Sequence, residues 1–583
     1  MGAFRSKVTA AAALSALAIG ATQACGQGSK SVAPAADNSV SSSTSLGAGA
    51  TGHSGSTAPG STSSATPNST GSTTSGAVGS SASSSSGGDG AAGAAGGDVL
   101  QHHTNPSRDG VYVDPSMTEA VAGTLKLDSA YAPTITGNVY AQPLYVASGA
   151  NGKPTIIVAT EENHVIALGL EDGVAPFWDA TFGTPVTNVG TVLGCGNIDP
   201  LGITGTPIVD PTSHAIYFDA MTLSGGAPLH MIHAVSIDTG VDLPGWPVAV
   251  DLVEGFTSQT QNQRGALQLF NGVLYVAFGG HNGDCNTYYG WVISVPVATP
   301  SQISGFSVGS IHAGASRGGI WGAGGIPTDG TSLFVSTGNT LNAGTTWSGG
   351  EAVLRLTPPT PTFTATSANA FYPTAWANYD ANDSDLGGAN PIVFDMPGAP
   401  VPHLVVALGK DGILYLLDRD DLGGEGNALS TTTVASDTGP AYFGALNGAG
   451  AAYTTSQGTY VAFHANGNAP GIAIEGCPGG QTGGNLGVAR ISTTNPPTAT
   501  VVWCASQASM GSPMVTSSGS GDVIVWDANT SLYGYDGDTG AMVFDGSTSP
   551  LPGPLQYFNT PIDAAGTMVV ATSGPAHVAL FRP

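Results

Sequence analysis

Thr206-Pro207-Ile208-Val209 is a short apolar strand that opens with a small residue and a proline, and further β-rich runs follow it. Comparable openings recur after residue 140 at Gln142-Pro143-Leu144-Tyr145, Gly265-Ala266-Leu267, Gly325-Ile326-Pro327, Asn390-Pro391-Ile392-Val393, Gly444-Ala445-Leu446, Gly511-Ser512-Pro513-Met514 and Thr560-Pro561-Ile562. Seven intervals span the 418 residues from Pro143 to Pro561, a period of about 60. A fixed period predicts a repeat architecture, because each unit buries its apolar faces against its neighbours.

Each repeat is predicted to be a four-stranded antiparallel unit. In the second repeat, strands are expected at Thr206–Val209, Ala215–Asp219 and Met231–Ser236, with a last strand near Trp246. The turn Asp238-Thr239-Gly240 suits such a unit, because Asp initiates turns and Gly accepts a positive φ. Glycine-rich turns between β-branched runs, with almost no helical periodicity, indicate an all-β chain.

Eight four-stranded sheets in sequence predict an eight-bladed β-propeller over residues 99–583. A seven-bladed ring is the alternative, because the fourth and sixth repeats have irregular interiors. The last repeat ends at Pro583 and lacks an obvious fourth strand. Residues Thr124–Ser129 could supply that strand and close the ring, which would remove an open sheet edge.

The N-terminal region is predicted to be a targeting segment and a linker. Arg5 and Lys7 precede an apolar run, and Thr22-Gln23-Ala24-Cys25 then resembles the lipid-attachment site of bacterial lipoproteins. We expect residues 1–25 to be a signal segment, with Cys25 as the lipid anchor of an exported protein of the bacterial cell envelope. Cleavage near Ala24, giving a secreted or periplasmic protein, is the alternative. Residues 26–98, rich in Ser, Gly, Ala and Thr, are predicted to be a disordered linker.

The net charge limits the classes of binding partner, and the number of cysteines limits the disulfide pairings. The chain has 13 Lys and Arg against 39 Asp and Glu, a net charge of −26, so we expect no nucleic-acid partner. Membrane contact is expected only through the N-terminal lipid, and the protein is expected to be a monomer. Apart from Cys25, four cysteines allow three disulfide connectivities, of which we favour one that joins Cys477 to Cys504.

One turn pattern resembles a known family. Asp536-Gly-Asp-Thr-Gly540 recurs in degenerate form as Ser236-Ile-Asp-Thr-Gly240 before Trp246, and Asn105-Pro-Ser-Arg108-Asp-Gly precedes the first repeat. This pattern resembles the repeat of the pyrroloquinoline-quinone (PQQ) enzyme superfamily. The resemblance implies an eight-bladed propeller that holds PQQ and Ca²⁺ over its axis. In such enzymes a Trp lies beneath the quinone, a basic residue lies near its oxygens, and a catalytic Asp takes the substrate proton.

The resemblance marks several candidate site residues. Trp321 is the candidate stacking floor, and Arg264 and Lys410 are candidate cofactor-binding cations. Asp383 and Asp385 are candidates for the catalytic base or a metal ligand. The structural alternatives are a blade-packing Trp, an ion pair for Arg264, a solvated turn for Lys410 and an Asx-turn for the two aspartates.

Asn197 and Asp199, after Cys195, are the candidate metal ligands, since Ca²⁺ prefers clustered oxygens. A second polar group, His281, Asn282 and Asp284, stands beside Cys285. Either group could line one mouth of the ring, and a surface loop is the alternative for each.

The sequence also departs from the family pattern. The resemblance implies a pair of adjacent cysteines above the quinone, but no two cysteines are adjacent here, and no C-x-x-C-H haem-attachment motif exists. We therefore expect an envelope-anchored, PQQ-like propeller that binds a small-molecule or protein ligand at its axis without catalysis. The alternatives are a PQQ- and calcium-dependent dehydrogenase of an alcohol or sugar, and a hydrolase or lyase on the same scaffold.

Overall fold

The computed structural model describes residues 97–171, 175–342, 344–437, 446, 448–465, 472–480, 485–506, 511–519, 521–573 and 576–583. The expected signal segment with Cys25 and residues 26–96 of the expected linker lie outside these ranges. Among the described residues, no helix combines the length and the apolar character needed to cross a lipid bilayer.

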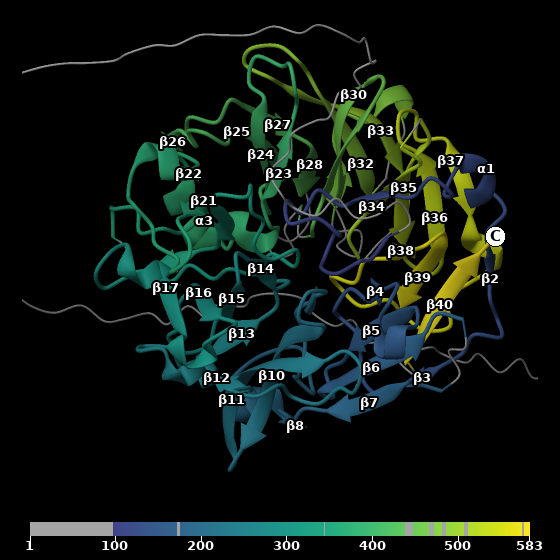
Figure 1. Cartoon of the computed structure of the whole chain (residues 1–583). Helices are drawn as coiled ribbons and strands as arrows, with labels where there is room; N and C mark the ends of the chain where they lie inside the picture. Colours follow the sequence, from purple (N-terminus) through teal and green to yellow (C-terminus); the bar gives the residue numbers. More distant parts are fainter. Residues whose placement is uncertain are drawn as a thin grey trace, which may run out of the picture. The chain divides into compact units, whose positions relative to one another are not determined.

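Eight small antiparallel sheets are arranged in a ring, which confirms the predicted eight-bladed propeller (Figure 1). The first blade contains β4 (Leu144–Val146), β5 (Thr155–Ala159), β6 (His164–Gly169) and β7 (Trp178–Thr181), and the second contains β8 (Thr184–Pro185), β9 (Ile208–Asp210), β10 (Ala215–Ser224), β11 (Ala227–Ser236) and β12 (Val248–Ala249). The third blade contains β13 (Gln261–Gln263), β14 (Gln268–Phe270), β15 (Val273–Gly280), β16 (Trp291–Pro296) and β17 (Ser304–Ser307). The fourth blade contains β19 (Leu333–Thr337), β21 (Ala352–Leu356), β22 (Ala370–Tyr372) and β26 (Gly424–Glu425).

The fifth blade contains β23 (Ile392–Asp395), β24 (His403–Leu408), β25 (Ile413–Asp418) and β27 (Ser430–Thr433), and the sixth contains β29 (Ala451–Thr455), β30 (Gly458–His464), β32 (Leu486–Ile491) and β33 (Ala499–Ala505). The seventh blade contains β34 (Met514–Ser517), β35 (Val523–Ala528), β36 (Leu532–Asp536) and β37 (Met542–Asp545) with β1 (Val111–Val113). The eighth blade contains β38 (Ile562–Ala564), β39 (Thr567–Ala571) and β40 (Ala576–Arg582) with β2 (Lys126–Leu127) and β3 (Thr134–Ile135).

Alternate residues of one strand pack against the two neighbouring blades. Leu274 and Val276 of β15 belong to an apolar cluster shared with the second blade, whereas Tyr275 and Ala277 belong to a cluster shared with the fourth. Successive side chains of a strand point to opposite faces, so a continuous apolar run such as that of β15 fills two cores at once. The period of about 60 residues therefore builds a ring of linked cores rather than one large core.

The N-terminal strand β2 closes the ring as predicted. Lys126 and Leu127 pair antiparallel with Arg582 and Phe581 of β40, the last strand of the eighth blade. The two ends of the propeller are therefore hydrogen-bonded together, and the edge of β40 is covered.

Residues 99–114, which we call the hub segment, cross the middle of the ring (Figure 1). Backbone hydrogen bonds connect this segment in chain order to six blades, through Tyr145, Val209, Thr328, Val393, Ala452 and Val515. Five of these residues lie in inner strands, and Thr328 forms an isolated bridge to Leu333 of the fourth blade. The third blade is reached by the Arg108 side chain, which donates to the Leu267 carbonyl at 2.7 Å. Through these bonds the hub segment reaches the first seven blades, and Asp114 at its end meets Asp563 of the eighth.

Two disulfides are present among the described residues. Cys477 pairs with Cys504 in the sixth blade, which confirms the predicted connectivity, and Cys195 pairs with Cys285. The second bond joins the loop after α2 (Val189–Val192) to the loop between β15 and β16.

Candidate functional site

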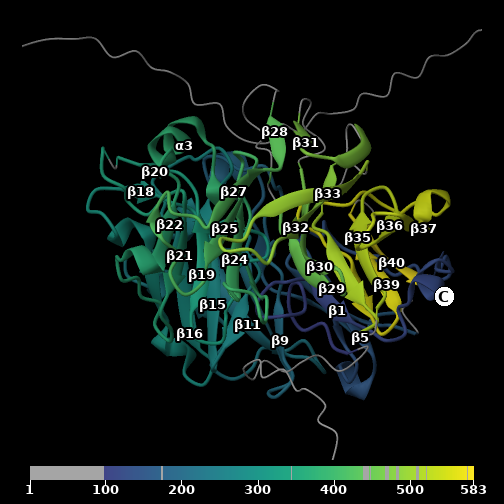
Figure 2. The ribbon, with the colours of Figure 1, turned by 90° about the horizontal axis from the view of Figure 1, so that it is seen from above.

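Loops that lead into the inner strands gather on one face of the ring, which we call the loop face. Arg264, Trp321 and Asp385 each precede the inner-strand residue of their blade that bonds to the hub segment. Because the inner strands run away from these loops, the hub segment crosses the axis on the side away from the loop face. Helix α3 (Trp376–Asn382), which ends next to Asp383, lies on the loop face together with β18 (Ser316–Arg317) and β20 (Thr340–Leu341) (Figure 2).

Trp321 lies in a nest of glycines. A Cβ atom on Gly279, Gly319 or Gly338 would overlap its indole ring, so only glycine permits this approach. The indole Nε1 donates to the Gly280 carbonyl at 3.2 Å, and the side chain is 9% exposed. Backbone segments of the third and fourth blades thus fix the ring in one orientation.

Lys410 and Asp385 form a buried ion pair beside this nest. The Lys410 ammonium contacts the Asp385 carboxylate and lies 3.3 Å from Asp383 Oδ2. The backbone N–H of Lys410 also donates to the Asp385 carbonyl at 3.0 Å. A Cβ on Gly338 would lie 2.6 Å from Asp385 Oδ1 and would also overlap Trp321, so the carboxylate and the indole meet the same piece of backbone.

Local structure explains the position of the two aspartates. Asp383 is the C-cap of α3 and adopts a left-handed φ of 56°, which turns the chain toward the inner strand β23. Asp385 follows that turn, and its Oδ1 accepts a 2.9 Å hydrogen bond from Asn339 N–H. Burial, reinforced by the Asp385 charge, raises the pKa of Asp383 to about 6 although Lys410 opposes the shift.

Two further polar residues of this centre were not predicted from the sequence. Asn339 Oδ1 and Glu351 Oε1 are buried and have no hydrogen-bond partner among the described residues. Glu351 Oε2 accepts from Leu386 N–H at 2.7 Å. Burial raises the pKa of Glu351, and the Asp385 charge adds to the effect. Only the contact with the Asp385 loop, which is distant in sequence, distinguishes these two residues from ordinary turn residues.

Arg264 lies on the loop face but contacts a different loop. Its guanidinium lies 4.8 Å from the centre of the Phe558 ring, which belongs to the loop before the eighth inner strand. The backbone next to Arg264 approaches that of Trp321, because Ala266 N–H donates to the Ala323 carbonyl. The loop face therefore carries Trp321, Lys410, Asp383 and Asp385 in one centre, and Arg264 at its margin.

Asn197 and Asp199 lie apart from this centre. Both residues are exposed, and the Asp199 carboxylate accepts hydrogen bonds from the backbone N–H groups of Asn188 and Val189 at the start of α2. In this structure the Asp199 side chain supports the loop that carries Cys195.

The centre offers a planar cofactor an aromatic surface and one ammonium group. An immobilised indole beside a buried ammonium group can stack on a quinone ring and bind its oxygens. Among the described residues, no three His, Cys, Asp or Glu side chains are placed to hold a metal ion. We therefore assign no chemical step to calcium.

Comparison with known proteins identifies solved structures with a similar fold. No protein-family model matches the chain, and no curated protein sequence matches it. A quinohemoprotein alcohol dehydrogenase from Comamonas testosteroni is similar in structure, with 14% sequence identity and a TM-score of 0.59 over 83% of this chain and 80% of that chain.

Two other dehydrogenases are similar to a comparable extent. For the alcohol dehydrogenase ADHIIG from Pseudomonas putida HK5, the identity is 13% and the TM-score is 0.58, over 84% of this chain and 80% of that chain. For a europium-containing methanol dehydrogenase, the values are 16% and 0.56, over 83% and 90%. At these identities the likeness shows the fold alone, a β-propeller similar to those of the three dehydrogenases.

Proposed function

We propose that the loop face binds a quinone of the PQQ type over Trp321 and that the chain oxidises an alcohol or sugar there. The observation that carries this proposal is the convergence of an immobilised indole, a buried carboxylate and a buried ammonium group from three separate segments. The similarity in fold to alcohol and methanol dehydrogenases supports the same reaction class. When bound, the quinone would accept the hydride, and with it the two electrons, that leave the alcohol, while the hydroxyl proton goes to a protein base.

Asp385 is the proposed general base. Its side chain is 3% exposed, whereas that of Asp383 is 28% exposed, and Lys410 contacts both. A proton taken from the substrate hydroxyl by Asp385 can therefore pass toward Asp383, which lies nearer to solvent. The pKa of about 6 suits Asp383 to release that proton at neutral pH.

PQQ binding and turnover can be measured separately. Purified protein would be titrated with PQQ, with and without Ca²⁺, and assayed by absorbance and by dye reduction with a panel of alcohols and aldoses. Asp385→Asn is expected to lower turnover by about 100-fold or more while PQQ affinity changes little. Asp420→Asn, in an exposed pair with His403, is the matched control and should leave both unchanged. Failure of the wild-type chain to bind PQQ would contradict the proposal.

Ligand binding without catalysis is the second candidate. It is favoured by the pairing of Lys410 with both aspartates, because this pairing holds their oxygens away from a substrate. PQQ binding without dye reduction by any alcohol or aldose would support this candidate. The lipid anchor at Cys25 and envelope location belong to the same proposal, and metabolic labelling with a fatty acid, with Cys25→Ala as control, tests them.

A further inference from the structure

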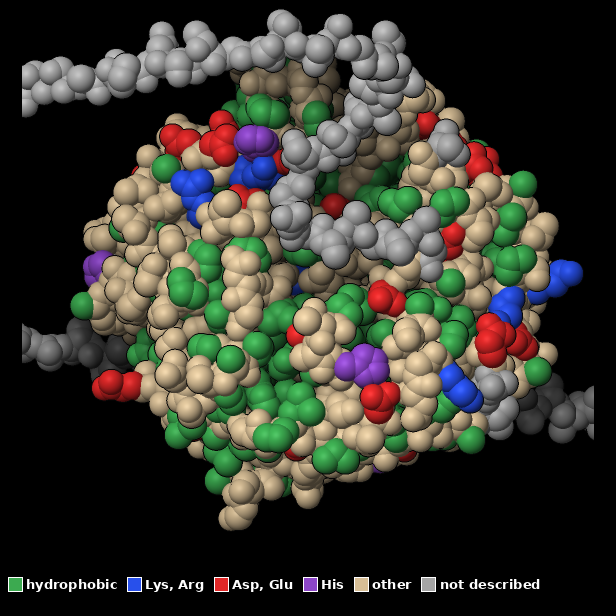
Figure 3. Space-filling view, viewed as in Figure 1, with side chains coloured by type: hydrophobic (Ala, Val, Ile, Leu, Met, Phe, Trp, Pro, Cys, Tyr) green, Lys and Arg blue, Asp and Glu red, His purple; other side chains and the backbone are tan. Residues whose placement is uncertain are grey.

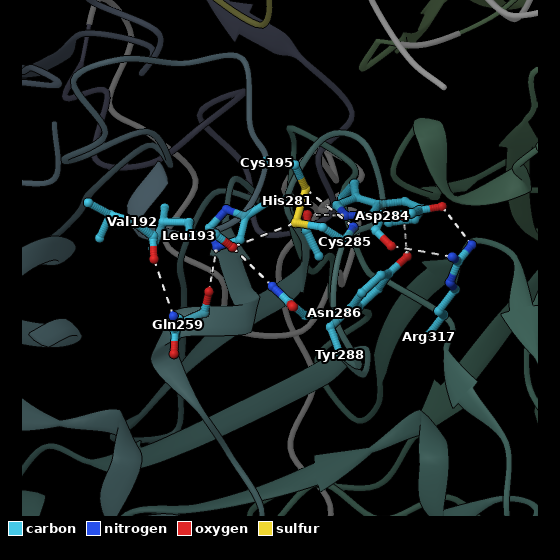
Figure 4. The surroundings of a disulfide bond; sticks show 12 residues. Val192, Leu193, Cys195, Gln259, His281, Asp284, Cys285, Asn286, Tyr288 and Arg317 are labelled. Carbon is cyan, nitrogen blue, oxygen red and sulfur yellow. Dashed lines mark hydrogen bonds and ion pairs between the residues drawn. A yellow bond between two sulfur atoms is a disulfide. The ribbon is translucent and has the colours of Figure 1, made fainter. Parts of the chain in front are cut away.

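The Cys195–Cys285 disulfide joins the loop after α2 to the loop between β15 and β16 (Figure 4). Asn286 Nδ2 donates to the Leu193 carbonyl at 3.0 Å, and Gln259 Nε2 donates to the Val192 carbonyl at 3.2 Å. Both cysteines are half-buried, so a reductant in solution can reach the bond. The disulfide thus closes the loop between β15 and β16 onto the loop after α2.

Asp284, immediately before Cys285, and Asn286, immediately after it, both adopt left-handed backbone, with φ values of 52° and 64°. Asp and Asn tolerate this conformation better than most residues with a Cβ, so both suit the tight loop around Cys285. The Asp284 carboxylate accepts from Tyr288 OH at 2.7 Å and pairs with Arg317 at 2.8 Å (Figure 4).

Tyr288 connects this loop to the indole. The Tyr288 side chain is fully buried, and its ring centre lies 6.1 Å from that of Trp321. Both rings pack on the end of strand β15: a Cβ on Gly280 would overlap Tyr288, and one on Gly279 would overlap Trp321. A shift of the Asp284 loop would therefore move the support of the indole.

Arg317 connects the same loop to the catalytic candidate. Arg317 N–H donates to the Tyr288 carbonyl at 2.7 Å, and Gly318 N–H donates to the Asn339 carbonyl at 2.8 Å. Asn339 N–H in turn donates to Asp385 Oδ1. A chain of contacts thus runs from Asp284, next to the disulfide, through Arg317 and Asn339 to Asp385.

We infer that the Cys195–Cys285 disulfide and Asp284 position Trp321 and Asp385, so that reduction of this bond weakens the site while the propeller stays folded. A dithiol would perform the reduction: the S–S bond breaks, two electrons and two protons reach the cysteines, and the dithiol becomes a disulfide. Asp284, Tyr288 and Arg317 are positioning residues in this scheme. The ligand readout below rests on the proposed function, whereas the exchange readout does not.

Hydrogen exchange of the full chain tests the positioning directly. In the C195S/C285S double variant, amides of residues 281–290, 317–319 and 338–339 are expected to exchange about tenfold faster or more, while those of β35 and β36 keep their protection. The C477S/C504S double variant is the matched control, because it removes one disulfide of the sixth blade. Unchanged exchange in C195S/C285S, or equal loosening in C477S/C504S, would overturn the inference.

A second variant keeps the disulfide and separates the two readouts. Tyr288→Phe retains the ring and removes only the hydroxyl bond to Asp284, so faster exchange of residues 281–290 is expected without loss of the fold. PQQ affinity should fall about tenfold in C195S/C285S, less in Tyr288→Phe, and not in C477S/C504S. If wild-type protein does not bind PQQ, the proposed function fails and the exchange data still decide this inference. If Tyr288→Phe and wild type have equal PQQ affinities and equal amide exchange rates, the Tyr288 hydroxyl does not help to connect the disulfide loop to Trp321.

Discussion

Arg108 Nη2 donates a 2.7 Å hydrogen bond to the carbonyl oxygen of Leu267, which lies 159 residues further along the chain. Arg108 Nη1 donates to Gln101 Oε1 and to the His102 carbonyl, each at 2.9 Å, and the side chain is fully buried. Arg108→Met keeps most of the apolar stem and removes all three bonds. We expect a loss of about 3 kcal/mol or more in the free energy of unfolding, measured by urea denaturation.

Lys126→Met is the control for that variant. Lys126 is exposed in β2, so removal of its charge should change the urea midpoint little. Equal midpoints for Arg108→Met and wild type would show that the hub segment does not hold the blades together.

Asp563 in the eighth inner strand meets Asp114 at the end of the hub segment. Both carboxyls are at most 4% exposed, and each has a buried Oδ2 without a hydrogen-bond partner among the described residues. Burial, reinforced by the charge of Asp114, raises the pKa of Asp563 well above its ordinary value. The folded state thus binds a proton that the unfolded state has released, so stability falls as pH rises from about 4 toward the folded pKa.

Asp563→Asn removes that loss and supplies an amide donor to Asp114. Its advantage over wild type in the free energy of unfolding should be small near pH 4 and should grow as pH rises, in all by about 1.4 kcal/mol for each unit by which the folded pKa is raised. The difference in melting temperature between the two proteins, measured across this pH range, follows that trend. Glu254→Gln, at an exposed position, should show no such trend. A constant difference between Asp563→Asn and wild type from pH 4 to 8 would argue against a buried proton at this pair.

The propeller could be predicted from sequence because its information is local and repeated. Each opening such as Thr206–Val209 predicts an inner strand, and the described strands β9, β10 and β11 lie where the second repeat predicted them. Most of the opening at Gly444 lies outside the described residues, and the sixth inner strand is β29. The hub segment could not be predicted, because residues 99–110 have no period and obtain their partners from seven different blades.

The candidate site was partly predictable for the same reason. Trp321 and Asp385 precede inner strands and Lys410 follows a second strand, so a closed ring brings such positions to one face. The acidic surface gives no comparable signal, since charged groups are scattered over it in small groups (Figure 3). Glu351, Tyr288 and Arg317 required three-dimensional information, because each acts through a residue far from it in sequence.

Gly338 limits the space for the indole and the carboxylate together. Gly338→Ala would force Trp321 or Asp385 to move, because its Cβ would collide with both side chains. We expect PQQ affinity to fall about tenfold or more, with a loss of about 1–3 kcal/mol in stability. In Gly521→Ala the new Cβ meets no atom within 4 Å, so this control should bind PQQ normally. Calorimetric titration of both variants with PQQ would show whether the glycines around Trp321 are needed for PQQ affinity.

Several histidines contact aspartates in a chain with only 13 lysines and arginines, and the His230–Asp219 pair is fully buried. His230 Nδ1 lies 2.6 Å from Asp219 Oδ2, and its Nε2 lies 3.0 Å from the Gln261 carbonyl. Burial lowers the pKa of His230, but Asp219 and the Gln261 carbonyl outweigh it, so the net shift is upward. The stabilisation from this pair is therefore complete below the unfolded pKa of about 6.5 and is lost as pH rises through the folded pKa.

His230→Gln should consequently cost most stability near pH 5 and progressively less above pH 7, measured as the melting-temperature difference from wild type. His403→Gln, whose partner Asp420 is exposed, is the matched control and should change the melting temperature little at either pH. A His230→Gln penalty that grows with pH would mean that the buried imidazole is neutral and that its Nε2 carries no proton toward Gln261.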